Sequence, residues 1–248
     1  MIVLGIDTAT PGLSAALVGP EGTIASFASE AGRRHTELLA PAIDDLCRTA
    51  GIGLGELDAF AVDVGPGLFT GLRVGLATAS ALSFALGRPA VGLTSTEILA
   101  WPHCEAGHDA LAVVDVRRSE VAWAYYPGVT GAAATATSPA LATPGALPEI
   151  LDGFRRPDRR LVVVGDGARR YRTVLEEAGF ADAVIDESPY PSAAVAAAIA
   201  RRRLLDGSLA RASIGPLYLR QADVRIGWES HDLPPGTTSH SRTRVERV

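Results

Sequence analysis

The stretch Gly65-Pro66-Gly67-Leu68-Phe69-Thr70-Gly71-Leu72-Arg73 decides the fold of this chain. An apolar run at 59–64 leads into it and a helical pattern at 69–86 leads out, so the sequence predicts a strand, a glycine-rich turn and a helix start in succession. Backbone N–H groups at such a turn lie at the positive end of the helix dipole, which suits a phosphate or another anion. Alternatively, glycine only relieves steric strain in a tight turn. The turn alone leaves both interpretations open.

Length, composition and charge narrow the class of protein. The 248 residues fit one large domain or two smaller ones, and 47% hydrophobic residues are enough for a sizeable core. The net charge of −5 gives no general attraction to nucleic acid, so an RNA contact would need a local patch or a partner. Cys47 and Cys104 have neither metal-ligand spacing nor a disulfide pattern. Without a leader or a bilayer-spanning run, we expect a cytoplasmic protein that contacts no membrane.

The order of the expected elements indicates two related halves. Strands are expected at about 2–7, 13–18, 23–29, 58–64 and 89–93, with helices from 34 and at 69–86. The strand at 2–7 ends in Asp7 and a hairpin partner follows; the strand at 110–115 likewise ends in Asp115 before 120–126. This repeat of strand, aspartate, turn and strand indicates an internal duplication. Beyond it we expect a strand at 161–164, helices through 178 and at 192–205, and a disordered tail from 229.

Four motifs resemble those of the TsaB (YeaZ) family, over about residues 1–228. They are Ile6-Asp7-Thr8-Ala9-Thr10, the 65–73 run, Val164-Gly165-Asp166-Gly167-Ala168 and Gly215-Pro216-Leu217-Tyr218-Leu219-Arg220. The resemblance implies the α/β superfold of actin-like ATPases (ASKHA), with two ribonuclease-H-like halves that we place at 1–103 and 104–228, before a tail at 229–248. It also implies a non-catalytic subunit that works with a catalytic TsaD subunit and a TsaE-type ATPase. Together these proteins form threonylcarbamoyladenosine next to the anticodon of tRNAs reading codons that begin with A.

Comparison with the kinases of this superfold and with TsaD relatives indicates that this chain is not a catalyst. Kinases of the superfold have glycine where Ala9 stands, and the loop 116–119 contains no glycine, so both phosphate loops are impaired. TsaD relatives carry a histidine pair where this chain has 94–100, a segment without histidine. His103 and His108 are five apart, and Pro102 and Gly107 are expected to break any helix there. We therefore expect no catalytic residue, no metal, and at most weak ATP or ADP binding at the interface with TsaD. Candidate nucleotide or anion contacts are Asp7, Thr8, Thr10, Gly65, Gly67, Thr70 and Gly71.

The aspartates that end the two strands allow a second hypothesis. Asp7 and Asp115 could be metal-linked or general-base carboxylates of a stand-alone enzyme, such as a small-molecule kinase, a metal-dependent carbamoyl or acyl transferase, or a glycoprotease-like protein. Alternatively, each caps its hairpin by accepting backbone N–H bonds, which we favour. His35, at a helix start, is expected to face solvent or to lie beside the helix cap, and not to act as a base.

The helix at 69–86 is the expected docking element. Apolar or small residues occur on every face of it and Arg73 is its one charge, whereas a helix with one side in water should show a polar stripe. TsaB relatives pair through their first two helices, with themselves or with TsaD. The resemblance therefore implies a homodimer in isolation, contact with tRNA only through the complex, and an interface made of Leu38, Leu39, Ile43, Leu72, Arg73 and Leu76.

Overall fold

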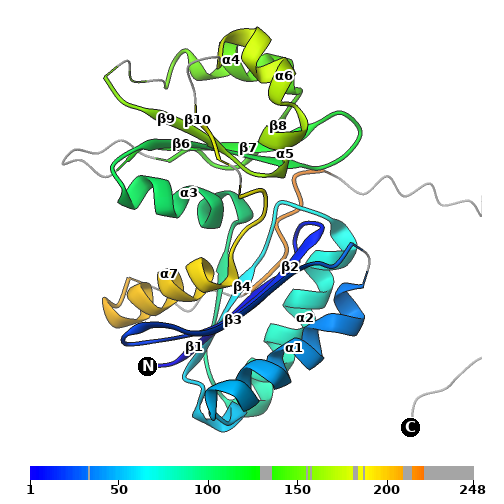
Figure 1. Ribbon diagram of the computed structural model, residues 1–248, viewed down its shortest axis with the longest axis vertical. Helices are drawn as coiled ribbons and strands as arrows, with labels where there is room; N and C mark the ends of the chain where they lie inside the picture. The colour runs from blue at the N-terminus through cyan, green and yellow to red at the C-terminus, as the bar shows by residue number, and fades with distance from the viewer. Residues whose placement is uncertain are drawn as a thin grey trace, which may run out of the picture.

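Two five-stranded sheets, one in each lobe, form the framework (Figure 1). The computed structural model describes residues 1–32, 34–128, 136–154, 156, 158–180, 184–186, 188–208 and 214–220. The first sheet has the order β3-β2-β1-β4-β5, with β1 (Val3–Asp7), β2 (Gly12–Gly19), β3 (Gly22–Glu30), β4 (Ala59–Asp63) and β5 (Ala90–Leu93). The second has the order β10-β9-β6-β7-β8, with β6 (Asp109–Asp115), β7 (Val121–Tyr126), β8 (Ala140–Ala142), β9 (Leu161–Val164) and β10 (Val184–Ile185).

The two sheets have the same topology, which confirms the predicted duplication. In each, the first strand pairs antiparallel with the next strand in the chain and parallel with the strand after the crossover: β1 with β2 and β4, β6 with β7 and β9. β1 and β6 are fully buried because helices cover both faces of each sheet, and both strands end in an aspartate. Asp7 and Asp115 therefore occupy equivalent positions in the two lobes.

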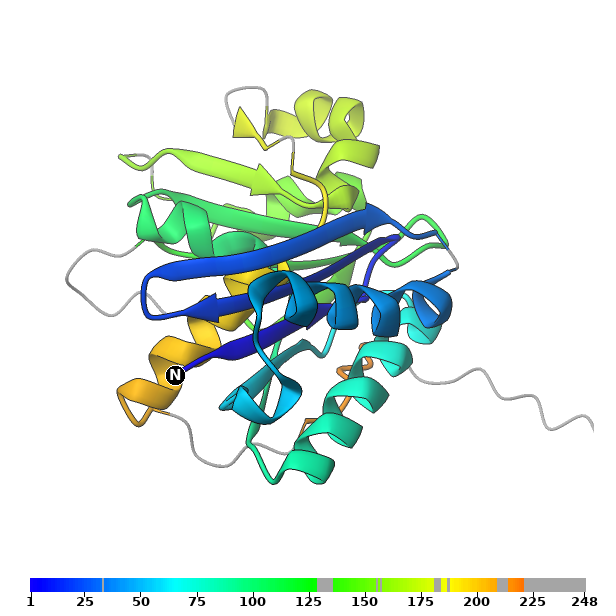
Figure 2. The ribbon, with the colours of Figure 1, turned by 60° about the horizontal axis from the view of Figure 1, so that its bottom comes forward.

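Helices cover each sheet on two sides. α1 (His35–Ala50) and α2 (Phe69–Leu86) pack on the outer face of the first sheet, and α7 (Ala193–Leu205) packs on the face turned toward the second lobe (Figures 1 and 2). α3 (Ser95–Glu105) packs on β6 and β7 from below, so α3 and α7 lie between the sheets. α4 (Leu147–Leu151), α5 (Asp166–Arg170) and α6 (Arg172–Leu175) lie on the second lobe.

Two helical predictions were incomplete. The helix expected through 178 is interrupted at Tyr171, whose φ of −107° and ψ of 23° separate α5 from α6. α3 was not predicted, because Pro102 lies inside it. A start signal was present in the sequence: the Thr94 side chain accepts a hydrogen bond from the N–H of Glu97 at 3.1 Å, the S/T-x-x-E arrangement of a capped helix.

The boundaries of the two halves stay predictions. The tail from 229 lies outside the described residues. α7 comes from the second half of the sequence, yet it packs against β1, β2 and β4 of the first sheet. α7 therefore completes the first lobe, while α3 from the first half packs on the second sheet, so the lobes exchange helices rather than dividing cleanly along the chain.

Candidate functional site

The glycine-rich turn packs directly against the loop of the first hairpin. A Cβ atom at Gly67 would lie 2.1 Å from the carbonyl oxygen of Ala9, and one at Gly71 would lie 2.0 Å from that of Thr8. The N–H of Leu68 donates to the Ala9 carbonyl at 2.6 Å. These contacts explain both glycines by close backbone approach, without a bound anion. Gly65 is required for a different reason, since its φ is +98°.

Most of the candidate anion contacts are already engaged within the chain. The Thr8 hydroxyl donates to the carbonyl of Gly71 at 2.8 Å and accepts from the N–H of Gly75 at 3.1 Å. Thr10 is 1% exposed and accepts from the N–H of Gly12. Thr70 is exposed and lines a cavity of about 750 Å³. Nucleotide or anion binding by the seven candidates stays a prediction, and Thr70 is the candidate with an open side chain.

Asp7 has a buried partner, Asp63, that the sequence analysis missed. Both are at most 1% exposed, and the Oδ2 atoms of both lack a hydrogen-bond partner among the described residues. Burial, reinforced by Asp63, raises the pKa of Asp7 well above its ordinary value, while burial raises the pKa of Asp63 to about 6. The burial of two neighbouring carboxyl groups accounts for the direction of both shifts. An aspartate ending the apolar strand β4 was the signal for this partner.

The aspartate of the second lobe is paired with arginines instead. The Oδ2 atom of Asp115 lies 2.9 Å from Nη1 of Arg117 and 3.2 Å from Nη1 of Arg170. These guanidinium groups compensate the charge that a metal ion would otherwise neutralise. The expected capping role is confirmed for both aspartates, because Asp7 accepts from the N–H of Ala9 at 2.9 Å and Asp115 from that of Arg117 at 3.0 Å.

The histidines are placed away from any metal-binding group in the described part of the chain. No cluster of three or more His, Cys, Asp or Glu with metal-binding geometry occurs among the residues that the structure describes. Nε2 of His103 lies 3.4 Å from Asp186. His35 is the first residue of α1, next to the N-cap Arg34, so the expected place beside the helix cap is confirmed, and it does not face solvent. Its ring is 5% exposed, and Nε2 lies 3.0 Å from the carbonyl oxygen of Thr10, which ties α1 to the first hairpin.

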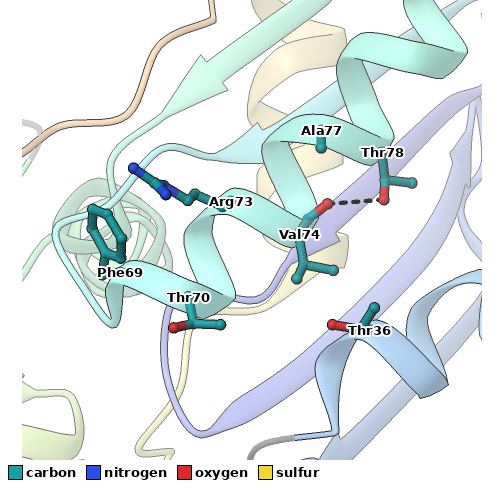
Figure 3. Close-up of a pocket in the computed structure, with 7 residues that line it drawn as sticks. All are labelled: Thr36, Phe69, Thr70, Arg73, Val74, Ala77 and Thr78. Carbon is teal, nitrogen blue, oxygen red and sulfur yellow. Dashed lines mark hydrogen bonds between the residues drawn. The ribbon is translucent and has the colours of Figure 1, made fainter. Parts of the chain in front are cut away.

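The outer face of α2 is an open apolar surface. Between the first turns of α1 and α2 lies a groove of about 440 Å³ lined by Thr36, Phe69, Thr70, Arg73, Val74, Ala77 and Thr78 (Figure 3). The guanidinium of Arg73 stacks 3.8 Å from the centre of the Phe69 ring. Farther along the helix, Phe84 is 92% exposed. Apart from Phe69 at the start of the helix, the exposed residues of α2 form what we call the α2 face; they are Thr70, Arg73, Ala77, Ser80, Ala81, Phe84 and Ala85.

The structure corrects which residues of these helices can meet another chain. Leu39, Ile43, Leu72 and Leu76 are at most 8% exposed, because they pack into the core beneath α1 and α2. The helical periodicity identified them as apolar but did not show which side of the helix meets the sheet. Leu38 is half-buried and Arg73 is exposed, so these two remain accessible. An interface through the two helices stays a prediction, now with the α2 face as its surface.

The duplicated ribonuclease-H-like lobes and the strand-ending aspartates between them define an actin-like, ASKHA-fold protein. The structure titled "YeaZ from Pseudomonas aeruginosa" superposes with a TM-score of 0.74 at 27% identity, covering 88% of this chain and 99% of that one. The ethanolamine utilization protein EutJ from Carboxydothermus hydrogenoformans superposes with a TM-score of 0.52 at 10% identity, a likeness of fold alone.

Sequence comparison assigns the family. The TsaD family, described as tRNA N6-adenosine threonylcarbamoyltransferase, matches residues 27–228. The TsaB protein of Escherichia coli is 36% identical over 129 residues, which cover 51% of this chain and 55% of that protein. An uncharacterized protein of Mycobacterium tuberculosis is 38% identical over 154 residues, which cover 58% of this chain and 72% of that protein. The chain thus spans about half the length of the TsaB relatives it matches. It belongs to the TsaD family and, within it, to the TsaB (YeaZ) group.

Proposed function

We propose that this chain is a non-catalytic partner subunit of a TsaD-type transferase that forms threonylcarbamoyladenosine next to the anticodon of tRNAs reading codons that begin with A. The Escherichia coli and Haemophilus influenzae relatives are named tRNA threonylcarbamoyladenosine biosynthesis protein TsaB, which supplies the reaction. The observation that carries a docking role is the α2 face, an apolar helical surface left open in the single chain.

A protein partner explains this face better than a membrane does. Among the described residues, α2 is long and apolar enough by composition to cross a bilayer, with a mean hydropathy of 1.3, and 28% of that helix is buried. Its ends, however, join β4 and β5, which are paired neighbours in the sheet, so insertion would require the sheet to open. Exposed apolar patches on soluble domains mark interaction sites. Small residues such as Ala77 and Ala81 allow a partner helix to approach closely.

A stand-alone enzyme is the less favoured function. In the second lobe, Arg117 and Arg170 compensate the charge of Asp115, and in the first lobe the pKa values of Asp7 and Asp63 are raised by burial. Neither Asp115 nor the Asp7–Asp63 pair is therefore suited to binding a magnesium ion with its phosphate. The remaining elements of the proposal are a cytoplasmic location, a TsaE-type ATPase as the third component, a homodimer in the absence of TsaD, and weak ATP or ADP binding at most.

Reconstitution tests the proposal. Purified TsaD-type and TsaE-type subunits from the same organism should modify tRNA only when this chain is added. Phe84→Glu replaces the most exposed large apolar side chain of the α2 face with a charge and should abolish both binding to TsaD and tRNA modification. Leu205→Glu is the matched control, because Leu205 is 59% exposed at the end of α7 and lies on another surface. Modification at the full rate without this chain would refute the proposal, as would robust ATP hydrolysis or acyl transfer by the chain alone.

A further inference from the structure

A second cavity lies between the lobes and carries three arginines. Its volume is about 560 Å³, within the range of small-ligand sites. Arg73 comes from α2, Arg117 from the turn between β6 and β7, and Arg220 from the segment at 214–220. No acidic side chain is among the described residues that line it. Arg117 and Arg220 are ion-paired with Asp115 and Glu120, which lie outside the lining, so among the described residues Arg73 supplies the uncompensated positive charge of the cavity.

Two exposed aromatic rings stand at the rim of the same cavity. The centroids of Phe69 and Tyr218 are 5.4 Å apart and their planes are inclined by 32°. Arg73 stacks on Phe69, and its Nε donates to the Tyr218 hydroxyl at 3.4 Å. The two rings remain 52% and 46% exposed, so the stack offers further aromatic surface. Exposed aromatic rings beside arginines are the arrangement on which unpaired nucleic-acid bases stack.

The backbone around the cavity places the arginines. The turn that carries Arg117 has three consecutive non-glycine residues with left-handed φ angles of 66°, 59° and 58°. Such a conformation costs free energy at residues with a Cβ atom. At Arg220 an ion pair with Glu120 joins the 214–220 segment to this turn, while the N–H of Leu217 donates to the Val64 carbonyl at 2.7 Å. Arg73 has no carboxylate within ion-pair distance in the described part of the chain.

We propose that this arginine–aromatic cavity binds one unpaired nucleotide of an RNA loop. The base stacks on Tyr218, extending the stack with Phe69 and Arg73, and the neighbouring phosphates contact the arginines. The inference rests on the proposed function, since that function supplies an RNA substrate with an anticodon loop. Asp7 to Thr10, the phosphate-loop candidates, line none of this cavity. Arginines on three separate elements fit consecutive phosphates of a strand better than the compact phosphate chain of one free nucleotide.

RNA binding by the assembled complex tests this. The complex of this chain with its TsaD-type subunit is titrated, by fluorescence anisotropy, with an RNA stem-loop, with the same RNA closed into a continuous duplex, and with AMP. The loop should bind most tightly. Tyr218→Leu should weaken loop binding about tenfold, while Tyr218→Phe, which keeps the ring, should stay within about twofold of wild type. Arg117→Gln should weaken loop binding. It should also lower the slope of log affinity against log salt concentration by about one, the amount expected for one lost phosphate contact. Arg88→Gln is the control for lost charge, because Arg88 is exposed beyond the far end of α2.

Three results would overturn the inference. One is loop affinity in Tyr218→Leu and Arg117→Gln within about twofold of wild type, in variants whose melting temperature shows them folded. Another is equal binding of duplex and loop, and the third is AMP binding as tight as that of the loop. These outcomes are separate from failure of the proposed function. If tRNA modification requires the chain while these variants bind RNA normally, the proposed partner role is supported and the proposed RNA contact is refuted. If tRNA modification does not require the chain, the proposed partner role is refuted.

Discussion

Replacing Asp63 by Asn should stabilise this protein at neutral pH. The Oδ1 atom of Asp63 accepts from the N–H of Gly65 and from the Ser95 hydroxyl, both at 2.7 Å, and an asparagine Oδ1 can accept the same two bonds. The Oδ2 atom has no hydrogen-bond partner in the part of the chain that the structure describes, and the amide nitrogen that replaces it can donate to Asp7. The substitution thus keeps the shape and the hydrogen bonds of the site while removing one buried negative charge.

The size and pH dependence of the effect follow from the raised pKa. Burial raises the pKa of Asp63 from 3.8 to about 6, so the folded state binds a proton more tightly than the unfolded state. The unfavourable contribution of ionised Asp63 to the free energy of unfolding is absent below the pKa of this group in the unfolded chain. It grows as the pH rises toward 6 and is complete above pH 6. At about 1.4 kcal/mol for each pH unit, ionising Asp63 costs about 3 kcal/mol above pH 6. Asp63→Asn should recover a gain of that order at about pH 8 and almost none at about pH 4.

Thermal unfolding at the two pH values measures this. For a protein of this size, about 3 kcal/mol corresponds to an increase in melting temperature of roughly 6–12 °C. Asp152→Asn is the matched control, because Asp152 is exposed, and it should leave the melting temperature unchanged at both pH values. Equal destabilisation by Asp63→Asn at both pH values would refute the reasoning, since it would mean that the carboxylate forms a favourable contact rather than carrying a buried, uncompensated charge.

Two further predictions concern packing and a buried ion pair. Gly71→Ala would place a Cβ atom 2.0 Å from the Thr8 carbonyl oxygen and should lower the free energy of unfolding by at least about 2 kcal/mol, whereas Gly55→Ala, with open space around it, should change little in urea unfolding. Arg156→Met leaves the buried Asp109 without its cation and should cost about 3 kcal/mol at neutral pH. Hydrogen bonds from Arg156 lower the pKa of Asp109 despite its burial, so this loss should shrink as pH falls below 4, and an undiminished loss in acid would contradict it.

Local sequence patterns predicted most of the fold because each element carries its own signal. The run Phe69–Leu86 is helical along its predicted length, and β1, β2, β6 and β7 lie where alternation and turns placed them. The failures have a common physical origin. Pro102 in α3 lacks only one backbone donor, and packing of α3 on the second sheet outweighs that loss. Local patterns do not contain such long-range contacts.

The site was less predictable than the fold, because it depends on which atoms face each other. Sequence singled out Asp7 but not Asp63, which lies 56 residues away in the chain and meets it across the paired strands β1 and β4. It also identified the apolar residues of α2, but two of those it assigned to an interface, Leu72 and Leu76, are buried beneath the helix. A helix that is apolar all round has little amphipathic pattern, so its outward side, including Phe84, becomes evident only when the sheet beneath it is in place.

The charges of equivalent aspartates are compensated differently in the two lobes. Asp7 with Asp63, and Asp115 with Asp166, follow corresponding strands of the two sheets, and burial raises the pKa of both Asp63 and Asp166 to about 6. In the second lobe Arg117 and Arg170 balance the charge of Asp115, whereas in the first lobe burial and the neighbouring Asp63 raise the pKa of Asp7. An active nucleotide site would need both pairs ionised and free to face a metal-bound phosphate. This difference between the two lobes supports our proposal that the chain acts through the surfaces around the cleft, the α2 face and the arginine–aromatic cavity, and not by catalysis.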